Sequence, residues 1–429
     1  MTDSKVPLIE LGDTGSRRWS GYTCEDFIPE LANSLNSSQV YDEMRRNDGT
    51  ISGIINTMNN LFHNVGWSFE TKGVDNDAEN KKRLVESMFD DMEKSFTQVL
   101  SDILTYPIYG YSLCEIVWKK RQGKQSDNRF NSRYDDGLWA PRKLPLRSQK
   151  TIIRWEFDDS GVPIAAVQQI PQTGKIVTIP LQKLLHFRTT TEQDLPNGIS
   201  ILRGSYESYQ FKKKIQRIEA VSLERELSGI PMIRLPSNYM QDEAPPELKQ
   251  IYKNIKEYAV NIRKNSQAAV VLPSDVDERG NYKFTLDLIK SAGQVQNDTN
   301  TIIKRYDSSI ARQLMASFVF LGTEGASYNI GEMQISLFSN ALNYYLDVVE
   351  SVINSKLIPQ IYENNGWVID DNIARVSHGR VGTLDFDLLS SAVMKLCQVG
   401  ALTPEPSLER YLREQGNIPQ MGLVEERLV

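Results

Sequence analysis

The spacing of apolar residues changes its period along this chain, and this change limits the fold more than any other feature. From about 109 to 188 apolar and polar residues alternate, which is the pattern of strands with one buried face. The alternation is clearest at Ile153, Trp155 and Phe157. Turn-forming residues at 158–161 and 172–175 separate the runs. The region is therefore predicted to be an antiparallel meander, with the polar segment 121–141 as an exposed loop.

Helical spacing precedes and follows this meander. Apolar residues from Ile51 to Phe62 recur on one face of a helix, and a longer stripe from Leu84 to Ile103 predicts a second helix that ends before Pro107. Pro196-Asn197-Gly198 is predicted to introduce a helix that runs to Gly229. The tail from Asp385 onward is predicted to hold two short helices.

The second half predicts a helix, a small β unit, a helix, a loop and a long helix. The first helix carries an apolar stripe over 248–262, and alternation over 268–288 indicates the β unit. A second helix covers 295–314, and a glycine-bearing loop at 322–327 separates it from a long helix through 333–353. The predicted fold class is α+β.

Composition excludes several classes of protein. The 429 residues include 49 Lys and Arg against 55 Asp and Glu, a net charge of −6, and 40% are hydrophobic. No apolar run approaches the roughly 18 residues of a membrane-spanning helix, and we expect neither a secretory signal nor membrane association. The acidic balance argues against a protein that coats DNA through its phosphates. Three distant cysteines are typical of reduced thiols in a cytoplasmic setting.

The titratable residues offer little chemistry. None of His63, His186 and His378 has a second histidine or cysteine at metal-ligand spacing, so no zinc site is expected. His186 lies in a predicted strand and is expected to be a buried structural histidine, whereas His378 beside Gly379 is expected to be more exposed.

Phosphate and nuclease chemistry are not expected either. The Gly322-x-x-Gly325 loop lacks the Gly-Lys-Ser/Thr of a P-loop, and there is no Gly-x-Ser-x-Gly motif. The acidic pairs Asp370/Asp371 and Asp385/Asp387 are better explained as a turn and a helix cap than as Mg²⁺ ligands. Catalytic residues, cofactors and metals are therefore predicted to be absent, and a scaffold or interaction role is favoured.

Five strings between about 40 and 231 are more specific. They are Tyr41-Asp42-Glu43-Met44-Arg45-Arg46-Asn47-Asp48, Tyr109-Gly110-Tyr111-Ser112-Leu113-Cys114-Glu115-Ile116-Val117-Trp118-Lys119, Pro180-Leu181-Gln182-Lys183-Leu184-Leu185-His186-Phe187-Arg188, Pro196-Asn197-Gly198-Ile199-Ser200-Ile201-Leu202-Arg203 and Leu223-Glu224-Arg225-Glu226-Leu227-Ser228-Gly229-Ile230-Pro231. In this order they resemble the portal proteins of tailed bacteriophages, the head–tail connector family. The last string departs from the family pattern, because Leu227 stands where a glycine is usual.

The resemblance implies a portal-type fold with a mixed helix and antiparallel-sheet wing. The implied parts are an N-terminal wing at 1–244, a first stem helix at 245–265, a β clip at 266–291, a second stem helix at 292–318, a tunnel loop at 319–328, a long wing helix at 329–366 and a helical, crown-like C-terminal region at 367–429. Stem helices of some 20 residues would each span about 30 Å, a plausible length for a channel wall.

The resemblance also implies roles for individual residues. The tunnel loop that faces DNA would include Gly322, Thr323, Glu324, Gly325 and Ser327. On the second stem helix, the candidates to face the channel are Lys304, Arg305 and Arg312. The clip interface would be formed by Tyr282, Phe284, Leu286 and Leu288. The loop offers a carboxylate and hydroxyls but no cation, so it would let DNA slide rather than hold it.

Portal proteins form homo-oligomeric rings, dodecameric in the virion, at one capsid vertex. The resemblance implies assembly in the host bacterial cytoplasm and a role as the conduit for double-stranded DNA during packaging and ejection. The implied partners are the terminase large subunit, the major capsid protein or scaffold, and a head–tail adaptor. Two alternatives remain: a metal-dependent nuclease, which needs carboxylates that converge in space, and a monomeric head-completion adaptor.

Overall fold

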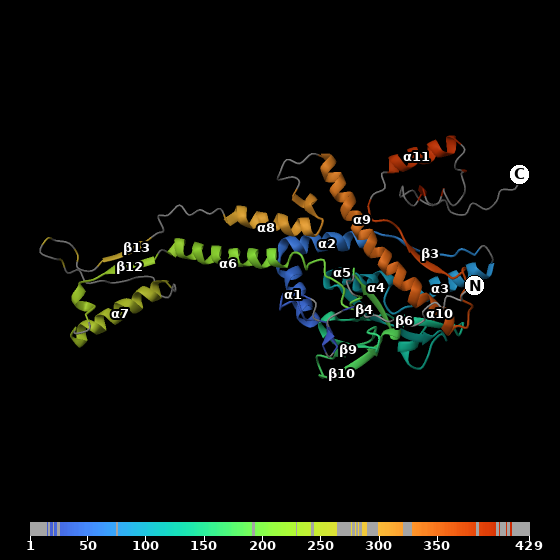
Figure 1. Ribbon diagram of the computed structural model, residues 1–429, viewed down its shortest axis with the longest axis horizontal. Helices are drawn as coiled ribbons and strands as arrows, with labels where there is room; N and C mark the ends of the chain where they lie inside the picture. Colours follow the sequence, from blue (N-terminus) through green and yellow to red (C-terminus); the bar gives the residue numbers. More distant parts are fainter. Residues whose placement is uncertain are drawn as a thin grey trace, which may run out of the picture. The chain divides into compact units, whose positions relative to one another are not determined.

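The computed structural model describes most of the chain (Figure 1). The described residues are 15, 18–19, 21–23, 26–73, 76–190, 194–228, 230–241, 244–263, 276, 279, 282, 285–289, 299–320, 328–382, 386–399, 403, 409 and 412–413. The chain divides into two compact units, and helices and antiparallel strands are mixed as the α+β prediction required. Unit 1 comprises Met1–Ser205 and Ala311–Val429, and unit 2 comprises Tyr206–Ile310.

Unit 1 begins with two helices joined by a single residue. Helix α1 covers Ser34–Asn47 and α2 covers Gly49–His63. Asp48 ends α1 and caps α2, because its carboxylate accepts hydrogen bonds from the amides of Thr50 and Ile51, both at 3.0 Å. The face of α2 predicted from its spacing is the buried one, formed by Ile51, Ile54, Ile55, Met58 and Phe62.

The single helix predicted over Leu84–Ile103 is wrong, because the chain forms two helices there. Helix α3 covers Asn76–Asp90 and α4 covers Phe96–Ile103. Helix α3 ends before Asp91, whose carboxylate forms an ion pair with Lys119. Ser95 caps the start of α4, because its hydroxyl accepts a hydrogen bond from the amide of Gln98 at 3.3 Å. Both helices bury the apolar residues of the same stripe, so spacing alone could not reveal the break.

The predicted meander is confirmed as a set of antiparallel sheets. Strand β4 (Tyr111–Glu115) lies between β11 (Leu184–Arg188) and β7 (Leu146–Arg147), and β9 (Pro163–Gln169) lies between β8 (Ile152–Phe157) and β10 (Ile176–Pro180). Strand β5 (Val117–Lys120) pairs with β6 (Trp139–Lys143). One apolar core joins the first two sheets, formed by Tyr111, Leu113, Ile152, Trp155, Ala166, Ile179 and Leu184.

Smaller elements complete the β region. They are β1 (Arg18–Trp19) with β2 (Tyr22–Thr23), β3 (Trp67–Glu70) with β14 (Arg375–His378), the short helix α5 (Tyr106–Tyr109), and the 3-10 turns η1 (Asn128–Phe130), η2 (Gln149–Thr151) and η3 (Leu181–Lys183). The pairing of β3 with β14 joins two segments some three hundred residues apart in the sequence.

The C-terminal part of unit 1 contains the predicted long helix. Helix α9 (Tyr328–Val352) continues through a π-helical turn (Ile353–Leu357) into α10 (Ile358–Asn364). Its core-facing residues are Phe338, Leu342, Leu346, Val349 and Ile353. Met333 and Leu337, which the predicted stripe included, are instead exposed. Helix α11 (Phe386–Gln398) is the first of the two predicted tail helices, and most of the second lies outside the described residues.

Unit 2 combines the helices α6 (Tyr206–Ser228), α7 (Pro246–Arg263) and most of α8 (Thr299–Gln313) with a two-stranded sheet. Helix α6 leads into β12 (Ile230–Arg234), the 3-10 turn η4 (Ser237–Tyr239) and α7. Strand β13 (Thr285–Ile289) pairs with β12 in antiparallel register, and α8 follows. Helix α7 contacts β12 and η4.

Helix α8 contacts α6, whereas the two-helix stem expected from the resemblance joined 245–265 and 292–318. Lys212 of α6 forms an ion pair with Asp307 at 2.5 Å, and the rings of Phe211 and Tyr306 stack with centroids 6.1 Å apart. Strand β12, which follows α6, pairs with β13, and Thr299 at the start of α8 donates a hydrogen bond to Glu219 of α6. The expected strand at 268–272 lies outside the described residues.

Candidate functional site

Four of the five strings that carried the resemblance lie in unit 1, and the fifth, at 223–231, lies in unit 2. The second string supplies β4 and the third supplies β11, and these strands pair along their whole length from Tyr111 opposite Arg188 to Glu115 opposite Leu184. Sequence similarity therefore falls on residues that build one packed core, not on residues scattered over the surface.

The second and fourth strings meet at two glycines. Gly110 has a φ of +91° and Gly198 a φ of +57°, in the region that favours glycine. A Cβ at Gly110 would lie 2.5 Å from the carbonyl oxygen of Asn197, and a Cβ at Gly198 would lie 2.2 Å from that of Gly110. The two backbones can approach this closely only because neither residue has a side chain.

This approach also explains where α6 begins. The predicted helix from 198 to 229 starts only at Tyr206, because 199–205 form turns against the second string. The amide of Ile201 donates to the carbonyl of Pro107 at 3.0 Å, and the hydroxyl of Ser200 donates to the carbonyl of Ile108. Those tertiary hydrogen bonds replace the ones that an earlier helical turn would have made.

Asp42, from the first string, is a buried hub. Its carboxylate faces Arg45 at 2.9 Å, Arg46 at 3.0 Å and Lys150, and it accepts from the hydroxyl of Tyr109 at 2.9 Å. Burial opposes ionisation of Asp42, but the hydrogen bonds outweigh it and hold the pKa well below its ordinary value. The hub ties α1 to α5 and η2.

His186, from the third string, is a buried structural residue, as predicted. Its ring lies near those of Tyr111 and Trp155, with centroids 6.4 and 5.2 Å away, and Nε2 is 2.8 Å from the carbonyl oxygen of Pro196. A carbonyl only accepts, so Nε2 carries the proton. Burial and the nearby Arg188 lower the pKa of His186 to about 3, so the ring is neutral at physiological pH.

An open pocket lies where three of the strings meet. Its volume is about 220 Å³, and its walls include Tyr41 of the first string, Tyr109 of the second, and Asn197 and Ile199 of the fourth. On one side Arg203 forms an ion pair with Asp26, and the ring of Phe27 is 86% exposed beneath the guanidinium. The walls are therefore mixed, with apolar residues beside hydroxyls, an amide and one paired charge.

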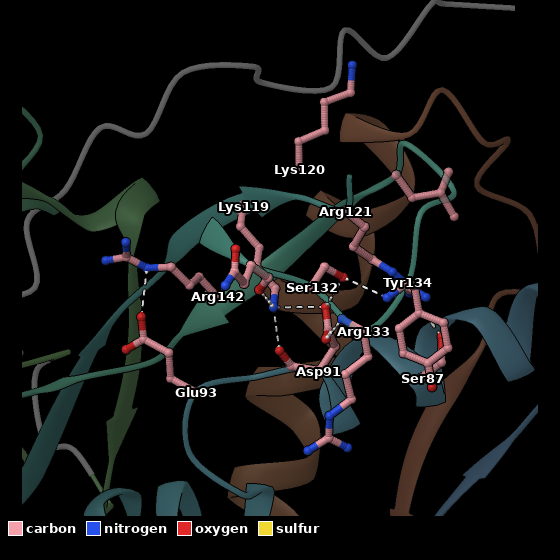
Figure 2. Close-up of polar contacts among 12 residues, drawn as sticks. Ser87, Asp91, Glu93, Lys119, Lys120, Arg121, Ser132, Arg133, Tyr134 and Arg142 are labelled. Carbon is pink, nitrogen blue, oxygen red and sulfur yellow. Dashed lines mark hydrogen bonds and ion pairs between the residues drawn. The ribbon is translucent and has the colours of Figure 1, made fainter. Parts of the chain in front are cut away.

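A second polar cluster fixes the segment 121–141, which is not the simple exposed loop that was expected (Figure 2). Lys119 and Asp91 form an ion pair at 2.8 Å, and their side chains are 4% and 3% exposed. Lys119 also donates to the backbone carbonyls of Asp91 at 2.6 Å and Asn131 at 3.2 Å. Asp91 in turn accepts from the hydroxyl of Ser132 at 2.6 Å and the amide of Arg133 at 3.0 Å.

Arg121 completes this cluster and is fully buried. Its guanidinium donates to the hydroxyl of Ser87 at 2.9 Å, lies 2.9 Å from a carboxylate oxygen of Asp136, and stacks 3.9 Å above the ring of Tyr134. These contacts hold both ends of the loop against α3 and β5. Their role is to fix the loop, although Nε of the buried Arg121 guanidinium has no hydrogen-bond partner among the described residues.

The predicted site residues are only partly within the described residues. Gly322, Thr323, Glu324, Gly325, Ser327 and Phe284 lie outside them. Tyr282 is 64% exposed, and Leu286 and Leu288 lie on β13, which pairs with β12. Lys304, Arg305 and Arg312 are exposed, and helical spacing puts them on the side of α8 opposite the residues that contact α6.

His378 is less exposed than expected, because only 5% of its side chain is accessible. Nε2 lies 3.0 Å from Asp347, and Nδ1 lies 2.7 Å from the carbonyl oxygen of Gly379. Asp370 accepts from the amide of Asn372 at 2.9 Å, so it forms the expected turn. Across the described ranges no three His, Cys, Asp or Glu side chains gather to hold a metal ion, and no helix is long and apolar enough to cross a membrane.

Comparisons with known proteins agree with these observations. Residues 38–418 match the family model described as the portal protein of Mu bacteriophage. The fold is similar to that of a chain in the neck of an empty gene transfer agent particle, with a TM-score of 0.50, 10% identity, and coverage of 89% of this chain and 94% of that one.

A portal protein of the HK97 phage family from Corynebacterium diphtheriae matches with a TM-score of 0.41 and 10% identity, over 80% of this chain and 94% of that one. No curated protein sequence matches this chain.

Proposed function

This chain belongs to the family of the portal protein of Mu bacteriophage, and we propose that its copies assemble side by side into a ring around a DNA channel. It is a phage portal protein, a structural component at the capsid vertex of the virion that serves in DNA packaging, and it is not an enzyme. The ring, its partners and the roles of individual segments are proposals, supported as follows.

The observation that carries the ring is an exposed apolar face on α6. Ile218 and Val221 fall on one side of this helix and are 51% and 44% exposed. They lie away from Ser208 and Lys212, which contact α8 as Phe211 does. An apolar face of this length is costly in water, and a neighbouring copy in a head-to-tail ring would cover it.

The pairing of α6 with α8 revises the assignment of the stem. We assign the stem to α6 and α8, which contact one another, and the clip to β12, α7 and β13 together with the bridge between Val276 and Tyr282. The other parts keep their expected roles: a wing in unit 1 that includes α9, and a crown-like region from 367 onward. The exposed Tyr282 and strand β13 are then available to terminase and, after packaging, to the head–tail adaptor.

Lys304, Arg305 and Arg312 would face double-stranded DNA in the channel. They share the side of α8 that α6 leaves uncovered, so one helix offers a cationic face while the other offers an apolar one. The tunnel loop with Glu324 remains a proposal based on the sequence, and its acidic ring would oppose tight binding of phosphates. Contact with the major capsid protein or scaffold would involve the wing.

Ring assembly is tested by light scattering and end-on electron microscopy of the purified chain. Rings of about twelve copies support the proposal, whereas a 48.8 kDa monomer at all concentrations contradicts it. Ile218→Asp and Val221→Asp should shift the mass distribution to monomer, whereas Lys214→Asp, an exposed polar control on the same helix, should shift it less. Ile255 is 7% exposed inside unit 2, so Ile255→Asp would disturb the subunit itself and is unsuitable.

The DNA path is tested by packaging assays. Glu324→Lys should leave rings and procapsids intact yet reduce the length or retention of packaged DNA, since each subunit gains a phosphate contact. Lys304→Ala with Arg305→Ala should alter packaging rate without loss of rings. Normal packaging in all these variants would mean that neither segment touches DNA. Divalent-metal-dependent DNA cleavage by the purified chain would support the nuclease alternative instead.

A further inference from the structure

Helix α9 is apolar on two opposite sides. One side packs in the core of unit 1 through Phe338, Leu342 and Leu346, which are at most 3% exposed. The other carries Met333, Leu337 and Tyr344, which are 59%, 55% and 46% exposed. A helix with apolar residues all round is normally buried on all sides, so the second face lacks a cover in the isolated chain.

The charge on α9 is entirely negative. Its 25 residues contain Glu332, Asp347 and Glu350 and neither lysine nor arginine. Asp347 follows Tyr344 by one turn on the outer face, and its side chain is 69% exposed. The side chain that faces both Asp347 and Glu350 is His378, whose Nε2 lies 3.0 and 3.7 Å from their carboxylates. The outer face of α9 is therefore an apolar stripe that ends in a carboxylate.

A complementary surface lies elsewhere in unit 1, at the pocket where the three strings meet. Tyr41, Tyr109 and Ile199 contribute apolar surface beside the polar side chains that also line the pocket, and Ile199 is 39% exposed. Arg45 lies 5.6 Å from the centre of the Tyr109 ring and shares Asp42 with Arg46 and Lys150. These three cations outnumber the carboxylates of Asp42 and Glu43, and the Arg46 side chain is 65% exposed.

We infer that the outer face of α9 in one copy docks on the pocket and cationic rim of α1 in the next copy. Met333, Leu337 and Tyr344 would meet the apolar walls, and Asp347 would meet Arg46. Within one chain α1 and α9 lie apart, each in contact with α2 (Figure 1), so the contact is assigned to two neighbouring copies. A closed ring requires two such different surfaces on every subunit. This inference rests on the proposed ring and assigns its contact in unit 1.

Disulfide trapping tests the contact directly in the assembled full-length chain. Leu337→Cys combined with Ile199→Cys should give, on oxidation, a ladder of covalent multimers on a non-reducing gel. Each single substitution is the matched control, because it retains the natural cysteines without the designed pair. Assembled rings of the double variant that yield no more multimer than the single variants would overturn the inference.

A charge exchange provides a second measurement that does not depend on cysteine chemistry. Arg46→Glu and Asp347→Arg should each lower the association constant of one interface about twofold to tenfold, and the combined variant should recover it. Arg46→Gln and Asp347→Asn remove each charge without reversing it, so they should lower the association constant less than the charge reversals do. Comparing the two sets separates the effect of charge at the interface from the loss of contacts with Asp42 or His378 inside one copy. Equal assembly in all variants would overturn the inference while the ring itself stood. Failure of the unsubstituted chain to form rings would overturn both.

Discussion

Removal of the Asp91 carboxylate should destabilise unit 1 more than removal of any surface carboxylate. In Asp91→Ala the Lys119 ammonium stays 4% exposed and loses its only carboxylate within 4 Å among the described residues. Breaking a buried pair on one side costs about 3–5 kcal/mol. The lower end, about 3 kcal/mol, applies here because the backbone carbonyls of residues 91 and 131 still accept from Lys119.

The assay is urea unfolding followed by tryptophan fluorescence, at one protein concentration for all variants. All six tryptophans lie in unit 1, so the signal reports the unit that contains the cluster. The matched control is Asp102→Ala, which breaks an ion pair with Lys94 of similar length, 3.0 Å, with side chains 32% and 55% exposed. Exposed pairs are worth about 1 kcal/mol or less, so the control should change the free energy of unfolding little.

Two further readouts belong to the same prediction. Asp91 accepts from Ser132 and Arg133, so its loss should free the segment 121–138 and speed tryptic cleavage at Lys124 or Arg129. Burial opposes ionisation of Asp91, but the Arg133 amide, Lys119 and Ser132 outweigh it, and its pKa lies below the ordinary value. The difference in free energy of unfolding between the unsubstituted chain and Asp91→Ala should therefore be largest above pH ~5. It should become smaller as the pH falls. Equal destabilisation in the Asp91 and Asp102 variants would refute the reasoning.

Three other predictions concern single residues of the strings: Gly110, His186 and Asp42. Gly110→Ala should cost about 1–3 kcal/mol, because its Cβ would lie 2.5 Å from a backbone oxygen, whereas Gly137→Ala, with φ +72° and open space around its Cβ, should cost less in the same urea assay. The pKa of His186 is about 3 in the folded state and about 6.5 in the unfolded state, so the unfolded state is protonated first as the pH falls. The free energy of unfolding should therefore decrease between pH ~6.5 and ~3. In thermal melts, His186→Asn should show a smaller decrease over this range. The pKa of Asp42 is depressed, so Asp42→Asn should destabilise at pH 7 and less near pH 3, and a pH-independent difference would contradict the assigned hub.

The sequence alone could predict elements whose signal is local. The 3.6-residue spacing of α2 and the alternation of β8 to β10 depend only on which residues are apolar, and both predictions are confirmed. The order of the five strings indicated the family, and four of the five lie together in unit 1. His186 could be identified as structural because it lies within a strand of apolar neighbours.

The contacts between elements were decided only by the tertiary structure. Apolar spacing identifies the apolar face of a helix but not the element that packs against it. It could not show which of the two apolar sides of α9 packs in the core, or that α8 contacts α6. It also could not foresee that Asp91 ends a helix to bind Lys119, or that Arg121 of a polar loop is fully buried. Burial of a charge depends on partners far apart in the chain, whereas periodicity records only neighbours along it.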